Sequence, residues 1–265
     1  MYCSAGNNWF VIEKTDDWKV FRCHKFFHKN IEIYSIKNNF KLCNDFSCKY
    51  YKECKIDCDL SYTTRSEKTS EYNNSIIRMS FHPVTTCLND CVYCGVKYPN
   101  NLSKESIPVE LTLKLFNDFK VNFPNSNLII EVAGGEPLLH KNINKIIDIL
   151  LEYSKNILLF TSIYNINNLK KIINKKIKFI VSCHPTGKMF NMHEFLDGIE
   201  MIYNSGNEFS VHIIDHFINK DFIKIYSDLL KKYTRLRIWR DEINMKKTNK
   251  ILQLMEYSNN KFYKI

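Results

Sequence analysis

From residue 75 onward, short apolar runs alternate along the chain with amphipathic segments. Six runs have the length and character of buried strands, and they cover residues 76–81, 128–132, 157–160, 177–181, 209–214 and 236–239. The segments between them repeat apolar residues three or four positions apart, as helices do, and the first of these segments begins at Pro108. The alternation predicts an α/β fold in which parallel strands are joined by right-handed crossovers. In such folds the chemistry lies beyond the carboxyl ends of the strands.

The rest of the chain differs in composition. Residues 61–74 are polar and lack apolar periodicity, which predicts a linker. We therefore expect the 265 residues to form a Cys-rich domain (1–60), this linker, a strand–helix domain (75–240) and a C-terminal extension (241–265).

Composition and charge narrow the functional classes. No stretch is long and apolar enough to span a membrane, and the first residues lack the basic flank and apolar run of a signal peptide. We therefore expect a cytoplasmic protein without a membrane partner, whose 10 Cys bind metal rather than form disulfides. The net charge of +10 would suit an anionic partner. Its basic residues are dispersed over predicted helix faces and no RNA-binding motif occurs, so nucleic acid is not the expected partner.

Two motifs follow the first two predicted strands. Cys87, Cys91 and Cys94 have the spacing C-x3-C-x2-C, with Tyr93 just before the last. A short loop can aim three such thiolates at one face of an iron–sulfur cluster and leave one iron open, whereas zinc usually requires four ligands. The second motif is the run 133–137, Ala-Gly-Gly-Glu-Pro, which alone could be an ordinary turn. The two motifs in this order, each at a strand end, are more specific than either one.

Together these motifs resemble the two signature motifs of the radical S-adenosylmethionine (radical SAM) superfamily. The resemblance covers about residues 75–240 and implies a partial (β/α)6 barrel. It also implies a [4Fe–4S] cluster held by the three thiolates, whose fourth iron binds the amino and carboxylate groups of SAM. The implied reaction is reductive cleavage of SAM to a 5'-deoxyadenosyl radical, with an electron from a donor such as flavodoxin or ferredoxin.

The resemblance further implies which residues contact SAM. Gly134 and Gly135 let the backbone approach the methionine end, and Glu136, followed by Pro137, accepts from the ammonium group. Tyr93 either packs near the adenine or only anchors its loop.

Other candidates follow the later strands. Ser162, beside Thr161, is expected to contact SAM or to cap a helix, and His184 to contact SAM or substrate. Cys183 is expected to be a buried apolar side chain. Substrate-side candidates by position alone are Asp215, His216 and Arg240.

The N-terminal region holds six more cysteines: Cys3, Cys23, Cys43, Cys48, Cys54 and Cys58. Their grouping resembles the auxiliary-cluster modules called SPASM or twitch domains, although those usually follow the radical SAM domain. The resemblance implies at least one auxiliary iron–sulfur cluster, of the [4Fe–4S] type. One cluster, two clusters or a zinc site remain open, with His24 and His28 as alternative ligands. The spacing of Cys43, Cys48 and Cys54 also resembles that of lipoyl synthase, but the Arg-Ser-Ser run of that family is absent.

The class of substrate can be predicted only from the resemblance to a known family. Relatives with SPASM or twitch modules commonly modify ribosomally made peptides, so a peptide is the expected partner. The alternative is a small metabolite, such as a sugar or a natural-product intermediate. Nucleic-acid modification, sulfur insertion and a non-catalytic iron–sulfur binder are more distant alternatives.

Overall fold

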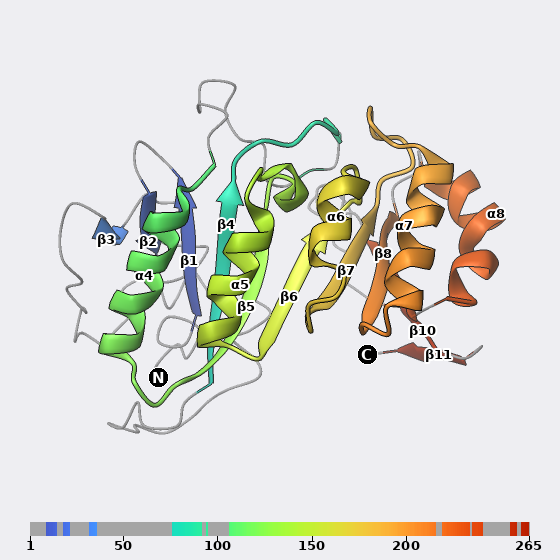
Figure 1. Cartoon of the computed structure of the whole chain (residues 1–265). Coiled ribbons are helices and arrows are strands. Elements are labelled where there is room, and N and C mark those ends of the chain that lie inside the picture. Colours follow the sequence, from blue (N-terminus) through green and yellow to red (C-terminus); the bar gives the residue numbers. More distant parts are fainter. Residues whose placement is uncertain are drawn as a thin grey trace. The chain divides into compact units, whose positions relative to one another are not determined.

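The computed structural model (Figure 1) describes residues 9–14, 18–21, 32–35, 76–91, 94, 106–215, 219–233, 235–240, 255–258 and 261–264. The chain forms two compact units, each built from several segments. The first unit comprises Met1–Thr85, Leu102–Gly134 and Lys145–Ile157. The second comprises Thr86–Asn101, Gly135–Asn144 and Leu158–Ile265.

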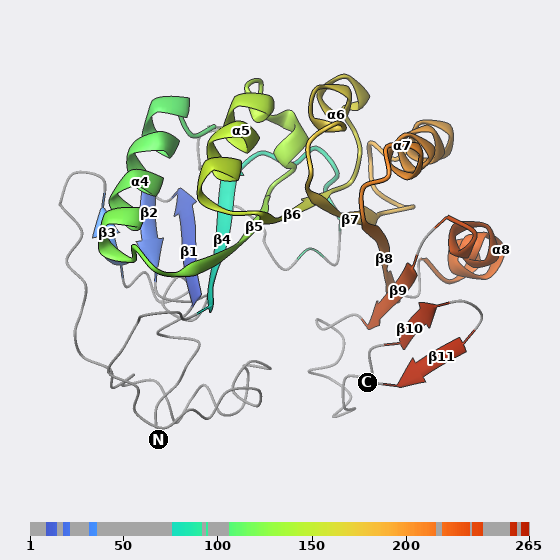
Figure 2. The same ribbon diagram turned by 60° about the horizontal axis from the view of Figure 1, so that its bottom comes forward.

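The first unit is built on a sheet in the order β3-β2-β1-β4-β5. Its strands are β1 (Trp9–Lys14), β2 (Trp18–Phe21), β3 (Glu32–Ser35), β4 (Ile76–Val84) and β5 (Asn127–Gly134). β4 runs parallel to both β1 and β5, while β1, β2 and β3 pair antiparallel. Helix α4 (Val109–Asn122) and most of α5 (Ile143–Tyr153) cover one face of this sheet, as Figure 2 shows. Phe81 of β4 meets Phe116 of α4 edge to face, with ring centroids 5.6 Å apart.

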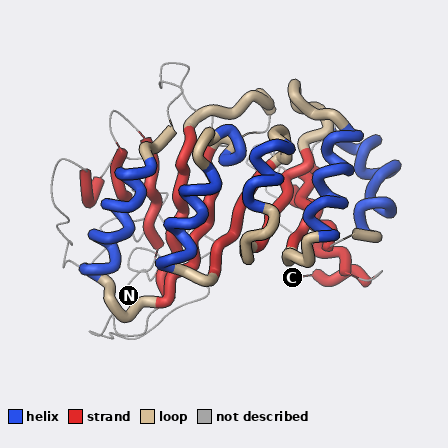
Figure 3. Tube along the Cα trace, in the orientation of Figure 1, coloured by secondary structure: helices blue, strands red, loops and turns tan. Residues whose placement is uncertain are grey.

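The second unit repeats the strand–helix alternation. β6 (Asn156–Thr161), most of which belongs to this unit, is followed by β7 (Lys178–Cys183), β8 (Phe209–Asp215) and β9 (Arg235–Arg240), all parallel neighbours. β10 (Met255–Ser258) and β11 (Lys261–Lys264) continue the sheet antiparallel. The helices are α6 (Ile166–Ile172), α7 (Met192–Asn204) and α8 (Lys220–Lys231), with a short 3-10 turn, η2 (Pro137–Leu139). In Figure 3 the loops that follow β6 and β7 lie at the same end of these strands.

The core of the second unit follows the period of two that a strand covered on one face requires. Along β6 and β7 every second side chain is buried and the intervening ones are half-exposed. The buried set on β7 is Phe179, Val181 and Cys183, each fully buried. The prediction that Cys183 is a buried apolar side chain is therefore confirmed.

The predicted α/β class is confirmed. All six expected strands exist as β4 to β9, with bounds that differ from the predicted runs by a few residues, and the helices lie between them. The pairing of β1 with β4 was not predicted. An apolar run that stands apart from the strand–helix alternation does not show which strand it pairs with. Within the described residues, no helix combines the length and apolar character that crossing a bilayer requires.

Two predictions concern residues outside the described ranges. The proposed domain boundaries near residues 60 and 74 stay predictions. The same holds for the N-terminal cysteines, Cys3, Cys23, Cys43, Cys48, Cys54 and Cys58, and for His24 and His28.

Candidate functional site

The three-cysteine loop leaves the end of β4 and makes a tight turn. Cys87 is exposed, Cys91 and Cys94 are half-exposed, and none of the three forms a disulfide with another described residue. The Cys94 N–H donates to the Cys91 carbonyl at 3.1 Å, and Asp90 has a φ of 45°, a left-handed conformation that Asp tolerates better than most residues. The hydrogen bond brings the backbones of the second and third cysteines of the loop together. Tyr93 lies outside the described residues.

The glycine-rich turn packs against the start of this loop. The Glu136 N–H donates to the Thr86 carbonyl at 2.8 Å, and Thr86 immediately precedes Cys87. A Cβ on Gly135 would stand 2.1 Å from that carbonyl oxygen, so only glycine fits. The two sequence motifs, more than forty residues apart, thus meet backbone to backbone.

Gly134 is constrained in a similar way within the first unit. Its φ of +102° is disfavoured for residues with a side chain, and a Cβ there would stand 2.8 Å from the Val84 carbonyl oxygen. Both glycines are therefore required by packing of the protein on itself. Their predicted role beside the methionine end of SAM stays a prediction.

The Glu136 carboxylate is buried and held entirely by neutral donors. It accepts from the Thr161 hydroxyl and the Ser162 N–H, both at 2.6 Å, and from the Leu138 N–H at 3.0 Å. Burial raises its pKa, and these hydrogen bonds oppose the rise. The carboxylate therefore joins the turn, in which Pro137 begins η2, to the end of β6. Ser162 takes part through its backbone, and contacts of either residue with SAM stay predictions.

A strained turn follows β6. Ile163 has a φ of 59°, which is unfavourable for a β-branched residue, and it is buried. Gly198 of α7 leaves the space that Ile163 fills, because a Cβ there would stand 2.3 Å from the Ile163 Cγ2. The Ile163 N–H also donates to the Thr161 hydroxyl at 3.0 Å. Packing and hydrogen bonding thus hold a conformation that the local chain disfavours, and this fixes the direction of the next residue, Tyr164.

Tyr164 was not singled out in the sequence. Its hydroxyl is buried and has no hydrogen-bond partner among the described atoms. Burial raises its pKa strongly, an interaction with the Ser162 side chain opposes the rise, and the negative charges that Cys87, Glu136 and Cys91 carry when ionised add to it. Tyr164 therefore lies in the electrostatic neighbourhood of the thiols. In the sequence, Tyr164 is distinguished only by its position just after the third predicted strand. Many loop residues have such a position, so it did not indicate a functional role.

Other acidic groups lie near Cys87. Partial burial raises the pKa of its thiol despite the exposure of the residue as a whole, and Glu136, Cys94 and Asp90 raise it further. A backbone hydrogen bond from Asn89 acts in the opposite direction. Deprotonation of these thiols is therefore unfavourable in the protein alone, and a cationic group bound beside them would favour it.

Three further candidate residues lie at or just after the carboxyl ends of β7, β8 and β9. His184 is half-buried after β7, and the burial of its ring lowers its pKa to about 4, so it is neutral near pH 7. Asp215 and Arg240 are register partners at the carboxyl ends of β8 and β9, which brings together the backbones of these two candidates. His216 lies outside the described residues.

The residues fit an iron–sulfur cluster in their chemistry but are not yet gathered around one. Among the described side chains, no three of the Cys, His, Asp or Glu type come close enough together to hold a metal ion. Three cysteine thiols on one loop nevertheless match the donors that such a cluster uses. The buried Tyr164 hydroxyl, which has no hydrogen-bond partner among the described atoms, could donate to an acceptor on a bound ligand.

Comparison with known proteins gives only distant similarities. No protein-family model matches the sequence, and no curated protein sequence is similar enough to be matched. A solved structure of anSMEcpe with bound AdoMet has a TM-score of 0.49 and 15% identity, over 64% of this chain and 50% of that chain. Streptococcus suis SuiB bound to precursor peptide SuiA has a TM-score of 0.48 and 13% identity, over 82% of this chain and 56% of that one. The chain thus spans about half the length of these proteins.

Proposed function

We propose that this chain is a radical SAM enzyme. The observation that supports it best is the 2.8 Å hydrogen bond between the Glu136 N–H and the carbonyl of Thr86, the residue before Cys87. It joins a three-thiol loop to a glycine turn at the carboxyl end of parallel strands, where α/β folds carry their chemistry. The acidic groups near Cys87, which would be anionic once deprotonated, also suit a site for a metal cluster and a sulfonium.

In this proposal the residues have distinct roles. Cys87, Cys91 and Cys94 would hold a [4Fe–4S] cluster, which when bound supplies the electron that cleaves the sulfonium of SAM. Gly135 allows the turn to lie against the cysteine loop, and Glu136 fixes that turn to β6. Tyr164 offers a buried hydroxyl to an acceptor on the bound ligand.

Neutral His184 is a further polar contact for SAM or substrate after β7. Because its pKa is about 4, it can donate or accept a hydrogen bond near pH 7 without carrying a charge.

The test is anaerobic reconstitution with iron and sulfide, followed by incubation with SAM and a strong reductant. We expect 5'-deoxyadenosine from the wild type and none from the Cys91→Ala variant, because the cluster would lack a ligand. Cys183→Ala is the matched control, since this buried cysteine lies in the same unit and is 0% exposed. Cleavage by Cys91→Ala at the wild-type rate would overturn the proposal.

The substrate is proposed to be a peptide, by the resemblance of the N-terminal cysteines to SPASM and twitch modules. A small metabolite is the alternative. A short peptide gene beside the gene of this protein would support the first, and sugar or antibiotic biosynthesis genes the second.

We also propose at least one auxiliary iron–sulfur cluster on the N-terminal cysteines. Iron and sulfide per chain should exceed the content of one [4Fe–4S] cluster, and a triple Ala variant at Cys87, Cys91 and Cys94 should still hold iron. A metal-free triple variant would contradict this second cluster while leaving the first untouched.

A further inference from the structure

Asn89 is the buried residue of the cysteine loop. It is 1% exposed, whereas its neighbours Leu88 and Asp90 are both exposed. Burial of an amide in a surface loop is unfavourable unless the amide is hydrogen-bonded. The Asn89 side chain accepts a hydrogen bond at Oδ1, whereas its buried Nδ2 has no partner among the described atoms, so the contacts through Oδ1 and the backbone indicate what the loop is built around.

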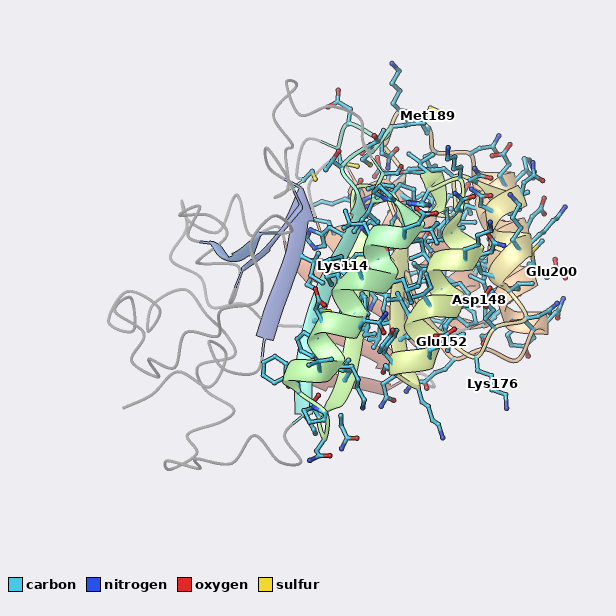
Figure 4. The ribbon with its side chains drawn as sticks, turned by 60° about the vertical axis from the view of Figure 1, so that its left-hand side comes forward. Lys114, Asp148, Glu152, Lys176, Met189 and Glu200 are labelled. Atoms are coloured by element: carbon cyan, nitrogen blue, oxygen red, sulfur yellow. The ribbon has the colours of Figure 1, made fainter. Side chains whose placement is uncertain are left out.

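Two of these contacts are made with the loop that follows β7. The Asn89 carbonyl accepts from the Lys188 N–H at 3.1 Å, and its side-chain Oδ1 accepts from the Met189 N–H at 3.3 Å. Figure 4 shows Met189 at the outer end of this loop, at the opposite end of the strands from Lys176, so the contacts lie at the carboxyl end.

Gly187 provides the space that the amide fills. A Cβ on Gly187 would stand 1.9 to 2.3 Å from Oδ1, Cγ and Nδ2 of Asn89. The Gly187 N–H donates to the His184 carbonyl at 2.8 Å, which closes the turn around the gap. The glycine and the asparagine therefore depend on each other.

The same residue contacts two thiols through its backbone. The Asn89 N–H makes a hydrogen bond to Cys87, and the Cys91 thiol donates to the Asn89 carbonyl at a sulfur–oxygen distance of 4.0 Å. One residue thus joins two thiols of the cysteine loop to a loop one hundred positions later.

We propose that Asn89 is a positioning residue, which fastens the cysteine loop to Gly187 and Met189 and so fixes the backbone that carries Cys87 and Cys91, two of the thiols that would ligate an iron–sulfur cluster. The inference rests on the proposed function for the identity of the group that the thiols hold. The contacts of Asn89 with Gly187, Lys188 and Met189, here called the lock, are present in the protein without any bound group.

The test compares Asn89→Ala, Gly187→Ala and the double variant in the full chain. Iron affinity is measured by competition with a chelator, counting only the iron that disappears when Cys87, Cys91 and Cys94 are all replaced. We expect each single variant to lose roughly 10- to 100-fold in iron affinity, as other supports of metal ligands do. The double variant should be no worse than Asn89→Ala, because removal of the amide makes room for the new methyl group.

Asn191→Ala is the matched control. Asn191 also accepts two backbone hydrogen bonds through Oδ1, from the N–H groups of His193 and Glu194, but it caps α7 instead of holding the cysteine loop. It should lower the melting temperature without changing iron affinity. Unchanged iron affinity in Asn89→Ala, losses that multiply in the double variant, or an equal loss in Asn191→Ala would each overturn the lock.

Hydrogen exchange of the metal-free protein separates this inference from the proposed function. The Lys188 and Met189 amides should exchange faster in Asn89→Ala than in the wild type. Met189 loses its acceptor, Asn89 Oδ1, and the Asn89 carbonyl that accepts from Lys188 is no longer held in place by the side chain. If the wild type binds no iron through its three cysteines, the proposed function fails, and the exchange rates still decide whether the lock exists. Unchanged exchange at both amides would overturn the lock.

Discussion

The residues in the middle of strands β6 and β7 differ from those at their carboxyl ends in how well their burial suits the stability of the fold. In the middle, Leu159 and Phe179 are 0% exposed and alternate with half-exposed residues, as ordinary sheet packing requires. At the ends, Ile163 is held at a positive φ, Tyr164 buries an unpartnered hydroxyl and Glu136 buries a carboxylate among neutral donors. Each of these end features is unfavourable for folding. The comparison indicates that the strand centres provide stability, while the ends carry features that cost stability, as the proposed ligand site would require.

The strongest test of this contrast sets Gly135→Ala against Leu159→Ala. The new methyl group at residue 135 would stand 2.1 Å from the Thr86 carbonyl, so the turn must move away from the cysteine loop. Because displacements of about 1 Å can reduce activity about 100-fold, we expect at least that loss in SAM cleavage.

Leu159→Ala should have the opposite signature. It removes a fully buried side chain, so the free energy of unfolding should fall by roughly 2–5 kcal/mol, while the folded protein still cleaves SAM. Calorimetry and the cleavage assay together separate the two. Equal effects of both variants on cleavage would remove the distinction between centre and end.

The second test uses the buried histidine after β7. Its folded pKa is about 4 and its ordinary value is 6.5, so between these values the unfolded chain binds a proton that the folded protein does not. Stability should therefore fall as the pH falls from 7 to 5, with His184 contributing about 2 kcal/mol of that loss. His184→Gln should flatten the dependence, as measured by denaturant unfolding at each pH.

His193→Gln, an exposed histidine at the start of α7, is the matched variant. If the slope of stability against pH in His184→Gln equals that of the wild type, His184 is not the buried neutral group that the structure shows.

The smallest effect concerns a single hydroxyl. Tyr164→Phe removes an unpartnered group, so the melting temperature should not fall, whereas SAM affinity should weaken roughly 2- to 10-fold through the loss of one hydrogen bond. Tyr153→Phe is the control, because the Tyr153 hydroxyl donates to Asn117 at 2.6 Å in the first unit. That variant should lose slight stability and no SAM affinity, as equilibrium dialysis with SAM can show. A stability loss in Tyr164→Phe with unchanged affinity would make the hydroxyl structural.

The sequence predicted those features that depend on neighbours along the chain. The strands β4 to β9 followed from apolar runs, and the two motifs followed from spacing, because both signals are local. The contact between Asn89 and Met189 joins residues one hundred positions apart, and no local pattern indicates it. The strain at Ile163 likewise depends on a missing side chain at Gly198. Gly134 and Gly135 were recognised by motif, but their packing against Val84 and Thr86 needed the structure.

The central claim is that the thiol loop and the glycine turn form one site for a cluster and SAM. Electron paramagnetic resonance of the reduced, reconstituted protein tests it most directly, using the signal that is lost when Cys87, Cys91 and Cys94 are replaced by Ala. We predict that saturating SAM changes that signal, because the ligand would bind at the open iron. A signal that is identical with and without SAM would contradict the claim and favour a non-catalytic iron–sulfur protein.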